Sequence, residues 1–243
     1  RGLVIGGLTA ATATGQLIFL PGLSKLAEIY SWKSISITIS LASIAVVPFV
    51  YLFLREKPAD VGLLPYGAPS DWQPPAKSEI PAGKLAIVTL KEASKKRDFW
   101  FLTGSFFVCG LSTSGLIGTH FIPAAHDHGM AEPVAASLLA LIGVFDVIGT
   151  LASGWLTDRF DPRKLLLAYY GLRGLSLFLL PSILFSTMHP STLVFVIFYG
   201  LDWVATVPPT IMLCRQVLGP TRATVVYGWV FAAHQIGGSV AAF

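Results

Sequence analysis

Three charged side chains occur in the middle of long apolar segments of this 243-residue chain: Asp146, Arg173 and Asp202. An unpaired charge at the centre of a bilayer costs at least about 2.5–3.5 kcal/mol, so such residues normally pair with one another or face water. Asp146 could bind a proton or a cation, because removal from water disfavours its charged form. It could equally form a permanent ion pair with Arg173 on the next segment, and the sequence leaves both interpretations open.

Asp202 belongs to a stripe of polar and aromatic residues. Its members are three or four residues apart and therefore share one face of a helix: Tyr199, Asp202, Trp203, Thr206 and Thr210. Such a stripe suits a path for a substrate, and the alternative is hydrogen bonding between neighbouring helices. Pro208-Pro209 should bend this helix and free carbonyl groups, which fits either a gating element or a passive kink.

The last apolar segment carries two strongly polar side chains, His234 and Gln235. A histidine changes its charge near neutral pH, so His234 could accept a proton or contact an anion. A hydrogen bond between helices is the alternative. The sequence 126–128 (His-Asp-His) is too small a set for a metal site, and Gly-x-Ser-x-Gly, Walker and His-Glu-x-x-His motifs are absent. We therefore expect no catalytic residue, no metal and no cofactor.

The elements that must position these residues are long and apolar. Hydrophobic residues make up 53% of the chain and charged residues 12%, whereas a soluble domain has about 25% charged residues. The mean hydropathy is +0.68. Seven apolar segments reach the length of about 20 residues that a helix needs to cross a bilayer: 3–24, 34–54, 99–122, 134–156, 165–187, 192–213 and 223–243. The sequence predicts an all-α integral membrane protein, with Cys109 and Cys214 as packing residues.

Lysine and arginine are distributed unequally between the two ends of these segments. If Arg1 is cytoplasmic, fourteen of the seventeen basic residues lie on that side, and only Lys25 and Lys33 lie in loops on the other. Such an excess marks the cytoplasmic side of a membrane protein. The net charge of +4 therefore indicates orientation and not a nucleic-acid partner. Loop 55–98 is cytoplasmic and rich in proline, and its end, residues 85–97, could lie along the membrane surface or form a solvated linker.

A short charged loop at residues 154–164 (Gly-Trp-Leu-Thr-Asp-Arg-Phe-Asp-Pro-Arg-Lys) separates two of the segments. It resembles the Gly-x-Leu-x-Asp-Arg-x-Gly-x-Arg-Lys signature of the major facilitator superfamily, found between helices two and three and again between eight and nine. The matching residues are Gly154, Leu156, Asp158, Arg159, Arg163 and Lys164, while Asp161 replaces the second glycine. In that superfamily the loop's charges hold one of the alternating-access states, so the resemblance implies a gating loop.

A short internal repeat agrees with that family. Residues 1–11 and 222–232 share an arginine, a valine, a glycine and an alanine at equivalent positions, and facilitator proteins consist of two six-helix halves related as parallel repeats. The resemblance implies helices five to eleven of twelve. Residues 1–54 would hold the last two helices of the N-terminal half, 55–98 the central loop, and 99–243 the C-terminal half before its last helix. We therefore expect an internal piece of a longer protein.

Three further stretches, 63–67, 145–150 and 170–174, look like bacterial members of the monocarboxylate transporter and oxalate–formate antiporter branch. Members of that branch move small organic anions, often with a proton, and several place Asp-x-x-x-Arg on the eighth helix, where the arginine meets the substrate carboxylate. Asp146 matches the aspartate, but Thr150 replaces the arginine. Threonine lacks the charged fork that binds a carboxylate. Another cation would be needed, and His234 is the best candidate within this chain.

The resemblance implies a monomeric secondary active transporter, a symporter or antiporter, in the bacterial inner membrane. Its substrate would be a small organic anion, carried with a proton by alternating access. The tenth helix, with Asp202, would line the cavity, and the ninth, with Arg173, would be peripheral, which favours a structural role for Arg173. The alternatives are a carrier of a neutral or cationic metabolite, a transport-dead membrane sensor, and a membrane-embedded enzyme on the same scaffold.

Overall fold

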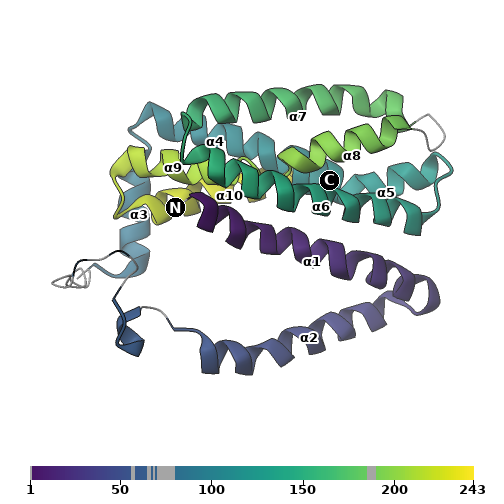
Figure 1. Cartoon of the computed structure of the whole chain (residues 1–243), viewed down its shortest axis with the longest axis horizontal. Coiled ribbons are helices and arrows are strands. Elements are labelled where there is room, and N and C mark those ends of the chain that lie inside the picture. Colours follow the sequence, from purple (N-terminus) through teal and green to yellow (C-terminus); the bar gives the residue numbers. More distant parts are fainter. Residues whose placement is uncertain (1, 56–57, 65–66, 68, 70–79, 185–189) are drawn as a thin grey trace. The chain divides into compact units, whose positions relative to one another are not determined.

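The computed structural model describes residues 2–55, 58–64, 67, 69, 80–184 and 190–243, and every regular element in this part of the chain is a helix (Figure 1). The helices are α1 (Gly2–Ile29), α2 (Trp32–Phe53), α3 (Ala82–Ala93), α4 (Arg97–Gly110), α5 (Gly118–Asp127), α6 (Glu132–Thr157), α7 (Pro162–Leu184), α8 (Pro190–Asp202), α9 (Val207–Leu218) and α10 (Ala223–Ala242). A 3-10 turn covers Pro58–Val61, and a π-helix, Leu111–Ile117, joins α4 to α5.

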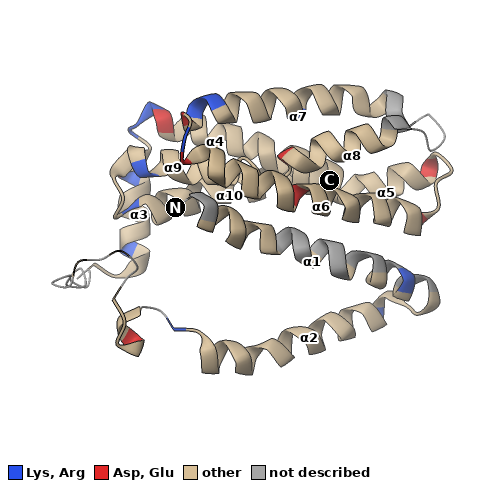
Figure 2. Ribbon diagram, viewed as in Figure 1, with Lys and Arg blue, Asp and Glu red and all other residues tan. Residues whose placement is uncertain are grey.

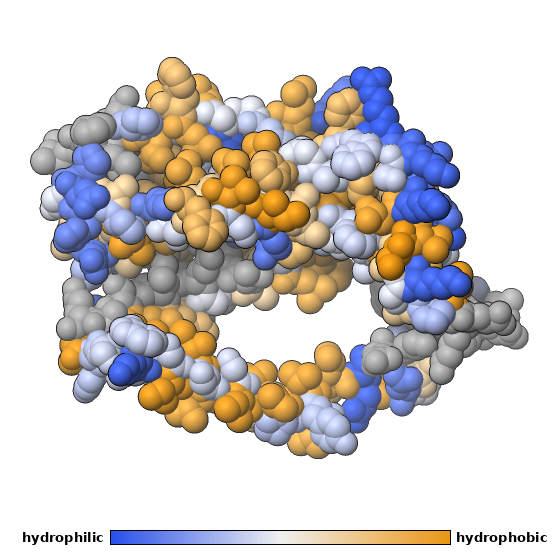
Figure 3. Space-filling model, turned by 180° about the vertical axis from the view of Figure 1, so that it is seen from behind, coloured by the Kyte–Doolittle hydropathy of each residue, from blue (hydrophilic) through white to orange (hydrophobic). Residues whose placement is uncertain are grey.

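Four stretches among the described residues are helical, long and apolar enough to cross a membrane: Trp32–Phe53, Arg97–Asp127, Glu132–Thr157 and Thr192–Leu218. They coincide with four of the predicted segments, and the described parts of the other three form α1, α7 and α10. The predicted all-α fold is therefore confirmed. On the face seen in Figure 3, hydrophobic residues occupy the middle of the helical bundle and hydrophilic residues gather at its two ends.

The chain forms two compact units, Arg1–Ser24 with Gly83–Phe243, and Lys25–Ala82. The smaller unit contains α2, none of whose side chains is buried. In the larger unit one apolar cluster includes Phe121 of α5, Ile142 of α6 and Phe195 of α8, and another includes Phe106 of α4 and Val230 of α10. All the residues of the candidate site belong to the larger unit.

Glycines let α10 pack closely against α4 and the π-helix. A Cβ atom at Gly110 would overlap the main chain of His234, and one at Gly237 would overlap the carbonyl of Phe107. Helices in lipid associate through small residues because these allow the backbones to approach. This contact fixes the position of α10, and with it His234, relative to α4.

The predicted span 192–213 is interrupted in the middle. Helix α8 ends at Asp202, residues 203–206 form a turn, and α9 begins at Val207. The two prolines that follow occupy the first turn of α9, where a missing N–H costs nothing. The break therefore lies immediately before the prolines, at the point where the sequence predicted a bend.

The end of the loop 55–98 is helical. Residues 82–93 form α3, in which Thr89 and Ala93 are fully buried. The indole of Trp229 in α10 donates a hydrogen bond of 3.0 Å to the Ala86 carbonyl. This segment is consequently docked on the helical bundle, and the alternative of a solvated linker is wrong for residues 82–93.

Candidate functional site

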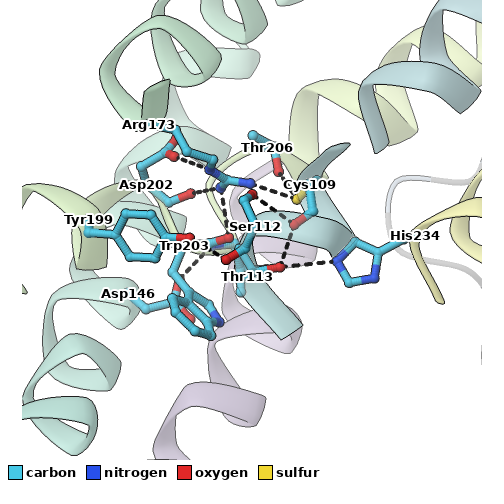
Figure 4. Close-up of polar contacts among 11 residues, drawn as sticks. Cys109, Ser112, Thr113, Asp146, Arg173, Tyr199, Asp202, Trp203, Thr206 and His234 are labelled. Atoms are coloured by element: carbon cyan, nitrogen blue, oxygen red, sulfur yellow. Dashed lines mark hydrogen bonds and ion pairs between the residues drawn. The ribbon is translucent and has the colours of Figure 1, made fainter. Parts of the chain in front are cut away.

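Arg173 of α7 lies at the centre of a buried polar cluster (Figure 4). Its Nε donates to Asp202 Oδ2 at 2.6 Å, and its Nη2 donates to the carbonyl oxygens of Asp202 at 2.7 Å and Trp203 at 3.0 Å. The last carbonyls of a helix have no donor within that helix. Arg173 therefore does two things at once: it neutralises Asp202 and it satisfies the C-terminal end of α8.

This pairing corrects two expectations. The hypothesis of a permanent ion pair between Arg173 and Asp146 is wrong, because the guanidinium binds Asp202 instead. Asp202 was expected to face the central cavity, but its side chain is only 3% exposed and lies against Arg173 of α7. The reason is the break after α8, which leaves carbonyls that attract the same cation. The expected structural role of Arg173 as a charge partner agrees with this geometry.

Asp146 of α6 is 1% exposed, and it also contacts the break between α8 and α9. Its Oδ1 accepts hydrogen bonds from the Thr150 hydroxyl at 2.8 Å and from the main-chain N–H of Val204 at 3.0 Å. Thr150 therefore orients Asp146. Among the described residues, neither Asp146 Oδ2 nor Asp202 Oδ1 has a hydrogen-bond partner. Two buried carboxyl groups thus share the neighbourhood of one guanidinium.

Further side chains from α6 and α4 complete the cluster, and the sequence analysis did not identify them as site residues. Ser153 donates to the carbonyl of Ala205 at 2.5 Å, so the break is held by three side chains from α6 and α7. The Nη1 of Arg173 donates to Cys109 Sγ at 2.9 Å, and this sulfur is 3.5 Å from the hydroxyl of Thr206. Serine and cysteine are common in membrane helices, so nothing in the sequence distinguished these two.

The predicted stripe on the tenth span is buried throughout. Tyr199, Thr206 and Thr210 have no exposed area, and Trp203 is 8% exposed. The Tyr199 hydroxyl donates to the Ser112 carbonyl of the π-helix at 2.8 Å. In this conformation the stripe makes contacts between helices, which is the alternative that the sequence left open.

His234 and Gln235 lie on α10, beside the cluster. His234 is half-buried and stacks on Phe231 with the ring centres 5.4 Å apart. Its Nδ1 is 3.1 Å from Gln235 Oε1, and its Nε2 is 3.5 Å from the hydroxyl of Thr113. Thr113 in turn donates to the carbonyl of Cys109 at 2.7 Å. A continuous polar path therefore runs from His234 through Thr113 and Cys109 to Arg173 (Figure 4).

The charged loop 154–164 connects α6 to α7. Asp161, which replaces the second glycine of the signature, accepts a hydrogen bond from the main-chain N–H of Arg163 at 2.9 Å. This is the geometry of an N-terminal cap, with Pro162 as the first residue of α7. The guanidinium of Arg159 lies 3.9 Å from the ring centre of Trp155. The aspartate at position 161 therefore caps the N-terminus of α7.

The other members of the charged loop lie at the surface or at the helix ends. Gly154 is buried, Asp158 is the C-cap residue of α6 and is exposed, and Lys164 is exposed in the first turn of α7. Arg163 Nη2 is 3.8 Å from Asp98 Oδ2 at the start of α4, and both side chains are about two-thirds exposed. Arg163 and Asp98 also border an apolar groove of about 700 Å³ between α4, α7 and α9. None of Asp146, Arg173 and Asp202 lines this groove.

Comparison with known proteins agrees with the helical fold and the charged loop. The chain matches the model of the Major Facilitator Superfamily over residues 1–242. It is 23% identical over 256 residues to the uncharacterized MFS-type transporter YcxA of Bacillus subtilis, covering 100% of this chain and 56% of that protein.

Two vertebrate relatives are also similar. Monocarboxylate transporter 12-B of Danio rerio is 24% identical over 254 residues, covering 97% of this chain and 52% of that protein. Monocarboxylate transporter 13 of Rattus norvegicus is 32% identical over 136 residues, covering 52% of this chain and 31% of that protein. The chain spans about half the length of the first two relatives. With the family match extending over nearly all of its residues, the chain belongs to the Major Facilitator Superfamily.

Proposed function

We propose that the whole protein is a proton-coupled secondary active transporter of a small organic anion, similar to a monocarboxylate, in the bacterial inner membrane. The observation that supports this function is the buried cluster of Asp146, Asp202 and Arg173. With both carboxyl groups ionised the cluster carries one excess negative charge. An unpaired charge away from water is costly. This cost favours binding of a single proton, which neutralises the cluster.

Asp146 is the proposed proton site. Arg173 forms an ion pair with Asp202 and donates hydrogen bonds to two carbonyls. Asp146 accepts only two hydrogen bonds, from a hydroxyl and from a main-chain N–H, and both are on the same oxygen. Protonation of Asp146 would alter its bond to Val204, which lies in the break between α8 and α9. A change of protonation is thereby linked to the conformation of the broken helix, and this is how the proton would favour one access state.

His234 is the proposed contact for the anion. Thr150 is bonded to Asp146 and carries no charge, and Arg173 already donates four hydrogen bonds, to Asp202, Trp203 and Cys109. His234 is half-buried next to the exposed Gln235, so its ring can meet a solute. The names of the vertebrate relatives, monocarboxylate transporters 12 and 13, support an anionic substrate for this chain.

The experiment is uptake by the full-length protein in proteoliposomes, using a panel of labelled small carboxylates and neutral metabolites with and without an inward proton gradient. The expected result is uptake of a carboxylate that the gradient accelerates. Asp146→Asn should abolish the acceleration while leaving exchange of internal for external solute, and His234→Ala should weaken uptake. Glu132→Gln, at an exposed acid in the first turn of α6, is the matched control and should change neither property.

A carrier of a neutral or cationic metabolite is the second candidate. It is favoured because Arg173 is already paired with Asp202 and Thr150 is uncharged, so neither provides a free positive charge for an anion. Uptake of neutral compounds that does not respond to the gradient, or anion uptake indifferent to both His234→Ala and Thr150→Arg, would replace the first proposal by this one.

A further inference from the structure

Helix α3 and the turn that follows it present a basic surface at one end of the larger unit. Figure 2 shows Lys and Arg gathered at the end of the bundle where α3 lies, while the middle of the bundle carries few charges. The basic surface consists of five exposed residues within fourteen positions: Lys84, Lys91, Lys95, Lys96 and Arg97. In Figure 1, α3 runs across the ends of the long helices and not alongside them. It is therefore oriented as a helix that lies in the plane of a membrane surface.

Among the described residues, the acids next to this surface pair with other basic groups and do not cancel its charges. Glu92 forms an ion pair with Arg222 at the start of α10, and Asp98 lies 3.8 Å from Arg163 of α7. Within the described part of the chain, none of the four lysines takes part in an ion pair. Four or more basic residues next to a membrane helix attract anionic headgroups.

Apolar side chains accompany the lysines on the exposed side. Ile87, three residues after Lys84 and four before Lys91, is 65% exposed, and Trp100 is 58% exposed. The indole N–H of Trp100 already donates to the Ser94 carbonyl at 2.7 Å, so its ring can enter the interface without losing a hydrogen bond. Exposed aromatic and aliphatic groups among lysines are typical of helices that lie at the headgroup level.

From this combination we infer that the exposed face of α3, with the turn after it, binds the anionic phospholipid headgroups of the cytoplasmic leaflet. The opposite face of α3 is attached to α10 through the Glu92–Arg222 ion pair and the bond from Trp229 to the Ala86 carbonyl. A lipid bound at α3 therefore lies on a helix that is attached directly to the helix that carries His234. This inference stands independently of the substrate and of proton coupling.

The test measures the preference of the full-length protein for phosphatidylglycerol over phosphatidylcholine. The protein is reconstituted in mixed bilayers, and spin-labelled forms of the two lipids report their relative association. Each basic residue close to an anionic leaflet strengthens association by about fivefold. The triple variant Lys84→Gln, Lys91→Gln, Lys95→Gln should therefore lower the preference by at least about tenfold. The triple variant with Arg at the same positions should retain it.

Two controls separate this surface from general charge and from free phosphate. Lys25→Gln with Lys33→Gln, in the loop predicted to lie on the other side of the membrane, should leave the preference unchanged. Raising the salt to about 1 M, where the screening length is about 3 Å, should reduce it. An undiminished preference in the Gln triple variant would overturn the inference. Displacement of the labelled lipid by millimolar inorganic phosphate would also overturn it, because it would show a site for free phosphate.

Discussion

Removing Arg173 should destabilise the protein more than any other single change in the buried cluster. Arg173→Met leaves Asp202 as an unpaired buried carboxylate and leaves the carbonyls of Asp202 and Trp203 without their donor. Loss of one partner from a buried ion pair costs about 3–5 kcal/mol. Asp202→Asn removes the charge but keeps an acceptor for Arg173, and a hydrogen bond to a charged group contributes about 1.5–3 kcal/mol.

The double variant is the decisive measurement. Arg173→Met with Asp202→Asn removes both members of the ion pair and leaves neither of them as an unpaired charge, so its loss of stability should be smaller than the sum of the two single losses by about 2 kcal/mol or more. The free energy of unfolding is measured on the full-length protein in mixed micelles, with reversible unfolding by dodecyl sulfate followed by circular dichroism.

The exposed pair of Asp98 and Arg163 provides a matched control cycle. Its side chains are 3.8 Å apart and about two-thirds exposed, and exposed pairs contribute about 0.2–1 kcal/mol. The coupling of Asp98→Asn with Arg163→Gln should therefore be clearly smaller than that of the buried pair. Additive effects of Arg173→Met and Asp202→Asn, within about 0.5 kcal/mol, would refute the assigned ion pair.

Four other substitutions, one of them a control, test the loop and the packing around the helix break. Asp158→Asn should slow uptake and leave membrane insertion and helix content intact; uptake at the wild-type rate would remove the proposed gating role. Gly149→Ala places a Cβ atom against a main-chain carbonyl of α8 and should lower the unfolding temperature, whereas Gly228→Ala meets nothing within 4 Å and should be neutral or stabilising by up to about 1 kcal/mol. Ser153→Ala leaves one carbonyl of the break without a donor and should cost about 1–3 kcal/mol of unfolding free energy; unchanged stability would mean that another donor serves this carbonyl.

The sequence by itself determined the helical architecture and the family. Long apolar segments predict membrane helices because every backbone group must be hydrogen-bonded within the segment once water is absent. The loop from Gly154 to Lys164 carries its information in consecutive residues, so it indicated the superfamily without knowledge of the fold. The position of the break in the tenth span was also predictable, because Pro208 and Pro209 mark it locally.

The choice of partner for Arg173 required the tertiary structure. Asp146 and Asp202 are both acids near the middle of apolar segments, and no local pattern distinguishes which of them meets the guanidinium. The choice depends on the rotation of α6, α7 and α8 about their axes and on the carbonyls that the break exposes. The sequence offered Asp146 as one possible partner of Arg173, and the structure pairs Arg173 with Asp202 instead.

Cys109, Ser153 and α3 illustrate the same limit. A cysteine or a serine in a membrane helix has the same local pattern whether it packs against lipid or completes a polar cluster, so Cys109 and Ser153 were found only through their contacts with Arg173 and with the break. The docking of α3 depends on Trp229, which is more than 130 residues distant in the chain. Helix formation depends on residues that are close together in the chain, so it can be predicted directly from the sequence. The pairing of buried polar groups is decided by which helix faces meet, and only the folded chain brings those faces together.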